Sequence, residues 1–563
     1  MPHNKTVTSL EIAKSLALRA VLAVGVVVGA TGPAASQAPV QVTARTNLTP
    51  AGGQLIIGAS SDTNSVSADG MTVLFASQAG ELVLSTFSVP AQIYARDVAS
   101  GINELISKGT SGGPSNDNSQ AGRMTPDGRF VVFHSDATDL VPLDLNGMTD
   151  IFLHDRTTGV TELISVTSWG TQATHQSRNP SVSDDGRFVA FHSKAKNLDS
   201  ADAWYYNDIF VRDRLLGTTD RVSLGMFGGD PNEDSAFPSI SADGLCIAYW
   251  SLASNLIFGD TNSVADFFVT NRLTGLTERV SVNSSGLEGT YVALPGNPSD
   301  APDISGDGRF VVYRSFASDL VSGDTNGVKD IFVRDRLLGT TTRVSVSSSG
   351  AEAAFPVSVT PDQRYPSISA GGKVVVFCSN ANNLVPGDDN STYDVFAHNL
   401  QTGITERISI ASDGTEGSDV SVISGISPDG RYVAFTSWAD NLVPNDTNHW
   451  RDSFLHDRMT GGPALSLSNV VAGQTATFGV SGASPGGLVF VGISLVGQGP
   501  IPSAWGPLEL GSLDLILPFA ADGTGAITVP IAVPLSLAGL PLWVQGIDFT
   551  MDFPTSVWGG VIQ

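Results

Sequence analysis

The stretch DISGDGRFVVYRSFASDLVSGDTNGVKDIFVRDRLLGTTTRVSV, residues 303–346, contains four short strands joined by turns. An Asp-Gly turn precedes the β-branched and aromatic run of residues 309–315, which predicts a strand. A polar loop separates this run from a third strand at residues 330–334. A hairpin loop closed by Gly339 then leads into a fourth strand at residues 341–346. The stretch therefore predicts a small antiparallel sheet of four strands.

The same pattern recurs seven times along the chain. The tight turn marks each copy, and successive copies are 58 or 64 residues apart. The turns stand at Asp69-Gly70, Asp127-Gly128, Asp185-Gly186, Asp243-Gly244, Asp307-Gly308, Gly371-Gly372 and Asp429-Gly430. A four-stranded unit repeated at this period is typical of β-propeller blades. The sequence predicts an all-β fold with a seven-bladed propeller.

The last copy shows how the ring closes. Its first three strands run to Arg458, but no clear fourth strand follows. Residues 40–47, VQVTARTN, resemble the fourth strand of another copy, TERVSVNS at 277–284. Because a ring must satisfy its terminal strand edges, we expect residues 40–47 to complete the last blade. The alternative is that residues 464–468 fill that place.

One blade copy carries a family resemblance. Residues 183–193 read SDDGRFVAFHS, and residues 208–214 read DIFVRDR. This pattern resembles the TolB-like family of propeller repeats over roughly residues 60–460. The resemblance implies the propeller fold. It leaves the activity open, since the family includes periplasmic translocation partners, peptidase propellers and other secreted proteins.

Composition and charge narrow the class of protein. The chain is 41% hydrophobic and only 15% charged, with a formal net charge of −25. Because this charge repels phosphate backbones, we expect no nucleic-acid partner. Residues 1–38 combine a basic start, an apolar run and small residues before a cleavage site, which predicts a signal peptide. No later stretch reaches the ~18 apolar residues of a membrane span, so we expect a secreted or periplasmic monomer.

The chain divides into three parts by composition. Residues 1–38 are the predicted signal peptide, and residues 39–462 are the predicted propeller. After Arg458 there is no lysine or arginine, and apolar runs alternate with Gly and Pro turns. Residues 463–563 therefore predict a small C-terminal β-sandwich. The two cysteines, Cys246 and Cys378, lie in strands of different copies, and we expect buried free thiols.

A polar loop between the second and third strands offers candidate metal ligands. Five copies spell Asp-x-Asn-x-x-x-Asp, and oxygen ligands in a tight loop suit a hard cation such as Ca²⁺. These candidates are Asp144, Asn146, Asp150, Asp260, Asn262, Asp266, Asp324, Asn326, Asp330, Asp388, Asn390, Asp394, Asp446, Asn448 and Asp452. The copy at Asp202 and Asp208 has Trp204 in the middle, and the first copy has Gln92 at the last position. The alternative is turn chemistry, in which Asp and Asn side chains cap their own backbone.

A second recurrence ends the second strand of every copy. These serines are Ser77, Ser135, Ser193, Ser251, Ser315, Ser379 and Ser437. A residue present in all seven copies indicates a structural role. The residue before each serine varies (Ala76, His134, His192, Trp250, Arg314, Cys378 and Thr436), which is where a propeller can encode a ligand.

The topology predicts which face binds. Strands of a blade alternate in direction, so loops between the second and third strands share a face with the connections between blades. These loops are longer and more varied than the turns of the other face, and binding residues concentrate in such loops.

The sequence favours a binding or interaction protein that takes a protein or glycan on this face, with Ca²⁺ as a candidate stabilising ion. It contains no zinc-ligand spacing, and its ~100 C-terminal residues are too few for an α/β-hydrolase domain. Two alternatives remain: a carbohydrate-active hydrolase or lyase that works at the propeller channel, and an envelope-associated structural protein docked through its C-terminal domain.

Overall fold

The computed structural model describes residues 42–49, 52–55, 59–60, 65–83, 89–290 and 300–458, and beyond these only the backbone of strands between residues 464 and 561. The predicted signal peptide, residues 1–38, lies outside the described residues. Residues 42–458 form one compact unit, and the C-terminal strands belong to a second.

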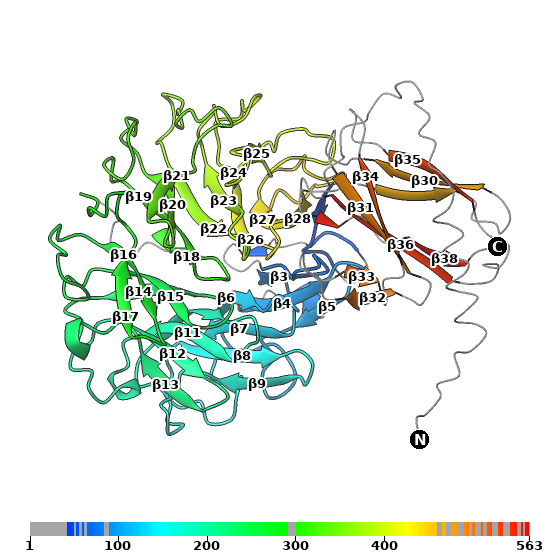
Figure 1. Cartoon of the computed structure of the whole chain (residues 1–563). Helices are drawn as coiled ribbons and strands as arrows, with labels where there is room; N and C mark the ends of the chain where they lie inside the picture. The colour runs from blue at the N-terminus through cyan, green and yellow to red at the C-terminus, as the bar shows by residue number, and fades with distance from the viewer. Residues whose placement is uncertain are drawn as a thin grey trace, which may run out of the picture. The chain divides into compact units, whose positions relative to one another are not determined.

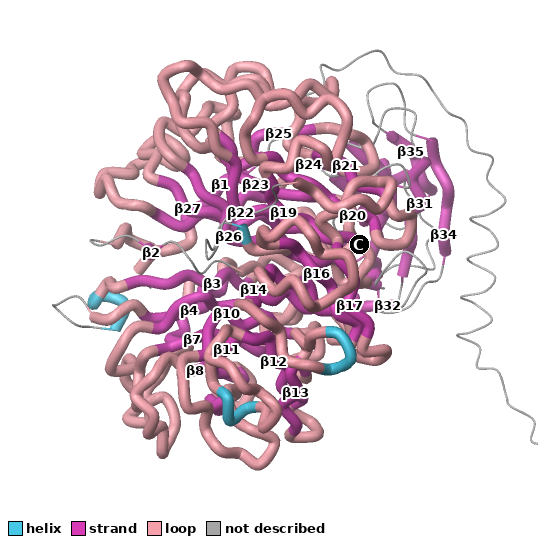
Figure 2. The backbone as a smooth tube through the Cα atoms, turned by 90° about the vertical axis from the view of Figure 1, so that its left-hand side faces the viewer, coloured by secondary structure: helices cyan, strands magenta, loops and turns pink. Residues whose placement is uncertain are grey.

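Seven four-stranded antiparallel sheets build the first unit (Figures 1 and 2), which confirms the predicted seven-bladed propeller. Blades 1 to 3 consist of β2 (Ala59–Ser60), β3 (Thr72–Ser77), β4 (Gln92–Asp97), β5 (Asn103–Leu105); β6 (Ser119–Met124), β7 (Phe130–Ser135), β8 (Asp150–Asp155), β9 (Val160–Leu163); and β10 (Ser177–Val182), β11 (Phe188–Ser193), β12 (Asp208–Asp213), β13 (Thr218–Arg221). Blades 4 to 6 consist of β14 (Ser235–Ile240), β15 (Cys246–Ser251), β16 (Asp266–Asn271), β17 (Leu276–Arg279); β18 (Asp303–Ile304), β19 (Phe310–Ser315), β20 (Asp330–Asp335), β21 (Thr340–Arg343); and β22 (Gln363–Ile368), β23 (Val374–Ser379), β24 (Asp394–Asn399), β25 (Thr405–Arg407). Short 3-10 turns are η1 (Gly80–Val83), η2 (Lys196–Leu198) and η3 (Met226–Gly228).

Blade 7 is completed by the N-terminal segment. It consists of β26 (Ser421–Ile426), β27 (Tyr432–Ser437), β28 (Asp452–Asp457) and β1 (Val42–Arg45), in the order β1-β28-β27-β26. Strand β1 pairs antiparallel with β28, with Arg45 opposite Phe454. The predicted closure is therefore confirmed, and residues 464–468 form a strand of a different sheet.

Buried apolar side chains gather between the blades. Each of the seven blade interfaces in the described unit has its own cluster. Within a blade, paired aromatic residues such as Phe133 and Phe152 stack across neighbouring strands, with ring centroids 5.8 Å apart. Second and third strands are buried on both faces, so they read as continuous apolar runs.

The repeated turn motif serves the fold. In blade 3, Arg187 follows the turn and donates two hydrogen bonds to Asp213 at the end of the third strand, at 3.0 and 2.7 Å. Gly186 has a φ of +70°, and a Cβ there would lie 2.2 Å from the Phe130 ring of blade 2. The glycine thus serves both the left-handed turn and the close approach of two blades.

The recurrent serines are also structural, as predicted. Ser135 Oγ donates to the Asn118 carbonyl and accepts from the Ala137 amide, at 2.9 and 3.1 Å. The variable residue before each serine is buried in every blade, and in blades 3, 5 and 6 it contacts the next one. For example, Cys378 Sγ accepts the Ile423 amide at 3.0 Å. The two cysteines are buried and free, which confirms that prediction.

The C-terminal segment is composed of antiparallel strands. One sheet has the order β29 (Ala464–Ser468), β30 (Thr475–Ser481), β35 (Ile527–Ala532). A second contains β34 (Leu515–Ala520), β31 (Leu488–Ser494), β36 (Pro541–Asp548), β37 (Phe553–Pro554) and β38 (Trp558–Val561), and β32 (Gln498–Ile501) pairs with β33 (Leu508–Leu510). These three antiparallel sheets agree with the predicted all-β module. The side chains that would pack them as a sandwich lie outside the described residues.

Candidate functional site

The Asp-x-Asn loops hold their own backbone through side chains. In blade 5, Asp330 is the fully buried first residue of β20, and it accepts Ser345 Oγ at 2.6 Å and Asn326 Nδ2 at 3.2 Å. Asn326 Oδ1 accepts the amide of Val328, two residues further on, at 3.1 Å. The asparagine therefore directs its NH₂ group toward the aspartate and its oxygen toward its own loop, which is the arrangement of turn chemistry.

An arginine from the fourth strand lies between the two aspartates of the loop. In blade 5, Arg343 Nη1 is 3.3 Å from Asp324, 3.2 Å from Asp330 and 3.0 Å from Glu352. Arginines in the other blades have the same neighbours: Arg279 with Asp260, Asp266 and Glu288; Arg407 with Asp388, Asp394 and Glu416; Arg221 with Asp202 and Asp208; and Arg45 with Asp446 and Asp452. The guanidinium thus neutralises part of the negative charge of each loop.

Blade 2 is the exception. Leu163 stands opposite Phe152, where the other five blades with this loop have arginine. Gln172 Nε2 instead donates to Asp144 at 2.6 Å and Asp150 at 3.0 Å. Blade 2 therefore holds its two carboxylates together by neutral hydrogen bonds.

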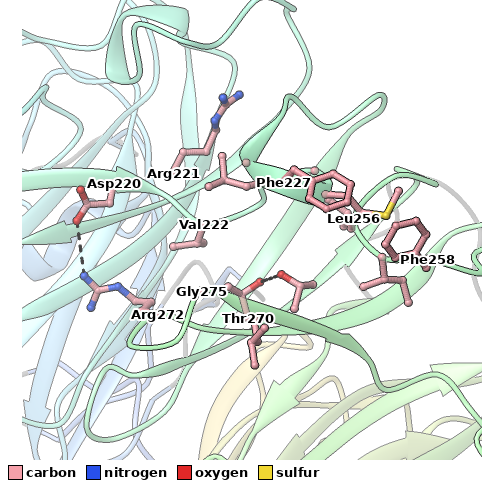
Figure 3. Close-up of a pocket in the computed structure, with 16 residues that line it drawn as sticks. Asp220, Arg221, Val222, Phe227, Leu256, Phe258, Thr270, Arg272 and Gly275 are labelled. Atoms are coloured by element: carbon pink, nitrogen blue, oxygen red, sulfur yellow. Dashed lines mark hydrogen bonds and ion pairs between the residues drawn. The ribbon is translucent and has the colours of Figure 1, made fainter.

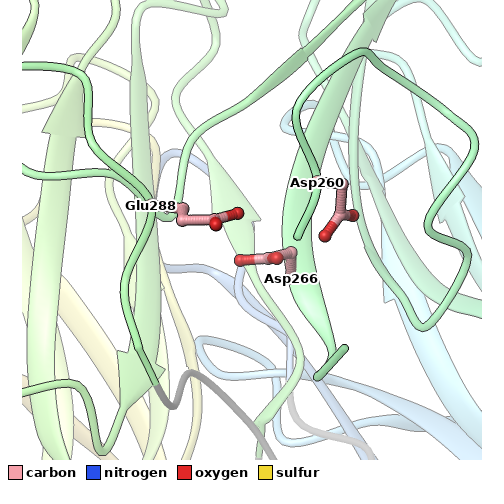
Figure 4. Close-up of side chains that lie close together, drawn as sticks. All are labelled: Asp260, Asp266 and Glu288. Atoms are coloured by element: carbon pink, nitrogen blue, oxygen red, sulfur yellow. The ribbon is translucent and has the colours of Figure 1, made fainter. Parts of the chain in front are cut away.

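Two blades gather three carboxylates closely enough to hold a metal ion. The groups are Asp260, Asp266 and Glu288 in blade 4, and Asp388, Asp394 and Glu416 in blade 6. In each group, one oxygen per residue lies within 4.8 Å of the others, and Figure 4 shows the blade 4 carboxylates converging. Three carboxylates around one arginine leave an excess of two negative charges.

The two glutamates were missed by the sequence analysis, although a signal existed. Glu288 follows Arg279 by nine residues, and Glu416 follows Arg407 by the same distance, as Glu352 follows Arg343. This second repeated spacing lies in the connection to the next blade, far from the Asp-x-Asn loop in sequence.

Burial shifts the pKa values of these aspartates upward. Desolvation, followed by the charge of Asp394, raises the pKa of Asp388 to about 7. Desolvation also raises the pKa of Asp266, Asp324 and Asp394 to about 6. Each carboxylate thus carries its charge in the fold at a cost in stability.

A further buried ion cluster joins blades 5 and 6. Lys329 Nζ lies 2.9 Å from Asp300, which also accepts Arg314 Nε at 2.5 Å. Arg314 Nη1 donates to the Gln363 carbonyl at 2.7 Å and contacts Asp362 at 3.2 Å. Both cations and Asp300 are almost fully buried, so this network ties the two blades together.

Exposed apolar side chains are unevenly distributed over the loops between second and third strands. Blade 2 exposes Leu143, Leu145 and Met148, and blade 3 exposes Trp204 and Tyr205. We call these five residues the apolar sector. In the corresponding loops of blades 5 and 6, the structure exposes no large hydrophobic residue.

A cavity of about 590 Å³ lies at the outer rim between blades 3 and 4. Figure 3 shows Phe227 and Phe258 at one end, and Asp220 and Arg272 at the other. None of these residues was predicted as a site, because they come from three separate segments with no shared motif.

No family model matches the chain, and neither does any curated protein at a significant level. Solved structures with similarity include a putative TolB from Agrobacterium tumefaciens, 15% identical over 57% of this chain and 88% of that one, with a TM-score of 0.35. The WD40 repeats of RRP9 are 9% identical over 75% of this chain and 99% of that one, with a TM-score of 0.40. A glycoside hydrolase of family 74 from Niastella koreensis is 11% identical over 83% and 68%, with a TM-score of 0.23. These likenesses do not indicate an activity.

None of the helical segments that the structure describes has the length and apolarity of a membrane span.

Proposed function

We propose that this chain is a binding protein whose partner contacts the apolar sector on the loop-bearing face of blades 2 and 3. Leu143 is the observation that carries the proposal. Its side chain is 80% exposed, and its φ is +67°, in the left-handed region that disfavours residues with a Cβ. The equivalent positions in blades 4 to 7 are Gly259, Gly323, Gly387 and Asn445, all with positive φ. Neither packing nor backbone geometry favours leucine here, and strained residues of this kind gather at functional sites.

The neighbouring residues support a protein partner. Leu145 is 79% exposed, whereas blades 4, 5 and 7 have threonine at that position. Trp204 and Tyr205 add two aromatic side chains, 59% and 61% exposed. Clusters of exposed apolar residues, such as the three within the blade 2 loop, mark protein interaction sites, and interfaces are enriched in Trp, Tyr and Met.

Site-specific photo-crosslinking tests the proposal. A photoreactive residue at position 145 in the full-length protein, expressed in its native host, should capture one protein reproducibly. The same residue at the exposed position 325, the equivalent site in blade 5, is the matched control. Equal capture from both positions, no capture, or capture of a glycan alone would overturn the proposal.

We also propose that Ca²⁺ binds the carboxylate clusters of blades 4 and 6 within the predicted set of Asp-x-Asn ligands. Buried oxygens support this: among the described residues, Asp388 Oδ2 accepts no hydrogen bond, and Asp260 Oδ1 has only the Arg279 guanidinium near it, at 3.4 Å. Binding to the folded state alone adds about 2.7 kcal/mol at a ligand concentration of one hundred times Kd. We therefore expect 10 mM CaCl₂ to raise the melting temperature over EDTA by several degrees.

The control for calcium binding is the double variant Glu288→Gln with Glu416→Gln. It should lose the effect of Ca²⁺ while remaining folded, because each arginine keeps its two aspartates. An unchanged melting temperature for the wild-type protein in Ca²⁺ and EDTA contradicts calcium binding.

Export through residues 1–38 belongs to the same proposal, with residues 39–462 as the binding propeller and residues 463–563 as an appended module. N-terminal sequencing of protein recovered outside the cytoplasm should give Pro39 as the first residue. Recovery of an uncleaved chain would contradict the signal-peptide assignment.

A further inference from the structure

The outer rims of neighbouring blades are joined by a recurring serine bridge. Between blades 4 and 5, Ser284 Oγ accepts the Thr341 amide at 3.0 Å and donates to the Thr341 carbonyl at 3.4 Å. Thr341 Oγ1 donates in return to the Val282 carbonyl at 2.5 Å. Thr341 belongs to the outermost strand of its blade, so a turn of the preceding blade covers this strand edge.

Three other rims are closed in the same way. Ser168 bridges to Thr219 between blades 2 and 3, Ser348 to Thr405 between blades 5 and 6, and Ser412 to Thr43 between blades 6 and 7. An exposed strand edge is a template for another strand. The serine bridge removes that template at four of the blade boundaries.

The boundary between blades 3 and 4 is open. Met226 occupies the position of the bridging serine, three residues after the buried Ser223. Its amide donates to the Asn255 carbonyl at 2.8 Å, so the turn bends toward a loop of blade 4. Thr277, the counterpart of Thr341, meets no serine hydroxyl in the described part of the chain, and its own hydroxyl contacts Thr270 at 2.9 Å.

The cavity of about 590 Å³ lies along this open edge. Leu224, Met226 and Leu256 contribute apolar walls, and Thr277 and Leu276 of β17 line the same space. Because alternate residues of a strand direct their main-chain N–H and C=O groups to one edge, Thr277 and Arg279 present these groups beside an apolar floor.

Two phenylalanines at the end of the cavity are exposed. Phe227 is 94% exposed and Phe258 is 76% exposed, and their rings meet edge to face at 5.9 Å (Figure 3). Phe227 also has a φ of +62°, where the equivalent residue between blades 4 and 5 is Ser285, which does not share this conformation. The fold thus keeps a strained, exposed aromatic residue at the mouth of the cavity.

We propose that this groove binds an extended peptide segment of another protein, which adds as a fifth strand along the free edge of β17. The four closed rims argue for this occupant, because at each of them a turn of the preceding blade already satisfies the amide and carbonyl of the threonine equivalent to Thr277. Strand addition derives affinity from main-chain hydrogen bonds, and pockets for alternate side chains give specificity. Here Phe227 and Phe258 form the pocket for apolar side chains.

The boundary between blades 1 and 2 is a natural comparison. There the Thr110 amide donates to the Asp139 carbonyl at 2.8 Å, so this turn bends in the same direction. However, its next residues are Ser111 and Gly112, which offer no apolar floor. We therefore expect peptide binding at the rim of blades 3 and 4 and not at this one.

Peptide selection tests the proposal on the full-length protein. A phage-displayed library of random ten-residue peptides is selected against the wild-type chain, and affinities are measured by fluorescence anisotropy. We expect peptides with alternating apolar residues. They should bind at least ten-fold more weakly to a closed-rim variant carrying L224V, G225N, M226S, F227S and G229L, which reproduces residues 282–287. The substitution G225N also disfavours the open turn, because a Cβ at Gly225 would lie 2.8 Å from the Asp230 carbonyl oxygen.

Further measurements make the outcome independent of that variant. Phe258→Ala, which leaves the turn intact, should weaken binding at least five-fold. Peptides N-methylated at alternate residues should lose binding, and hydrogen exchange should show protection of the Thr277 and Arg279 amides. The double variant Trp204→Ala with Tyr205→Ala should bind the peptides with wild-type affinity. The test of the peptide site is therefore independent of the test of the apolar sector. The proposal is overturned if no peptide is selected, or if the closed-rim variant and Phe258→Ala both bind the peptides with wild-type affinity. Protection from hydrogen exchange at a different strand would also overturn it.

Discussion

At the scale of single residues, Leu143 combines exposure with a glycine-type backbone conformation. Replacing Leu143 with Gly removes about 1–2 kcal/mol of left-handed strain and costs about 0.5–1 kcal/mol through the freer unfolded chain. We therefore expect Leu143→Gly to raise the free energy of unfolding by up to about 1 kcal/mol while it weakens partner binding. Chemical denaturation measures the first effect, and a clear loss of stability would contradict the assigned strain.

The buried aspartates give a signed pH dependence. Asp388 has its pKa raised to about 7, chiefly by burial, so the folded state holds its proton up to a higher pH than the unfolded chain. As pH rises from 5 to 8, Asp388 ionises in the folded state, and the protein loses stability that it would keep with an uncharged side chain at this position. Asp388→Asn should therefore gain about 1–3 kcal/mol relative to wild type between pH 5 and pH 8, measured by urea unfolding.

The control for this pH effect is Asp335. The hydrogen bonds from Arg309 hold its pKa below the usual range, so its charge stabilises the fold at both pH values. Asp335→Asn should therefore be less stable than wild type at both pH 5 and pH 8. Its free energy of unfolding should not rise relative to that of wild type as pH increases. An effect of Asp388→Asn that is independent of pH would contradict the assigned burial penalty.

The sequence identifies residues that repeat and does not identify residues brought in by the fold. The structure brings the side chains of the Asp-x-Asn pattern together in each loop, and their role as metal ligands stays a prediction. The arginine between them was missed, because Arg343 lies 19 residues after Asp324 in a strand that pairs back against the loop's own blade. Phe227 and Phe258 could not be predicted together, since only the contact of two blades brings them within reach.

At the scale of elements, β1 was predicted because residues 40–47 match an outer strand in sequence. Arg45 and Asn47 take the places of the repeated arginine and serine. Asn47 Nδ2 donates to Asp452 at 2.6 Å, and Arg45 lies 2.6 Å from Asp446. The short β18, with two residues, and the serine bridges between rims depend on tertiary contacts that no local pattern specifies.

Strand β1 also provides a test of ring closure. Arg45→Ala leaves Asp446 and Asp452 buried without their cation, and breaking a buried ion pair costs about 3–5 kcal/mol. We expect a loss of that size in urea unfolding. The matched control is Arg129→Ala, which removes a more exposed pair with Asp155 and should cost less than half as much. Equal losses would contradict the role of β1 as the closing strand.

At the scale of the whole molecule, comparison of the seven blades distinguishes residues that maintain the fold from residues proposed to bind a partner. The turn glycines, which all seven blades share, allow one blade to pack onto the next, and the Arg–Asp pair of blades 2, 3, 5 and 7 joins two strands of one blade. The blades differ in their exposed loop residues and at the open rim. Exposed large hydrophobic residues lie in the loops between the second and third strands of blades 2, 3, 4 and 7, and the open rim lies between blades 3 and 4, so the two proposed binding surfaces lie on blades 2 to 4.

Exchange of one loop tests this account most directly. Residues 143–148 of blade 2, LDLNGM, are replaced by residues 323–328 of blade 5, GDTNGV, and the partner captured at position 145 is titrated against both proteins. The account predicts an unchanged or higher melting temperature with at least a ten-fold loss of affinity. Undiminished affinity in a folded variant would contradict the claim that the apolar sector is the binding surface.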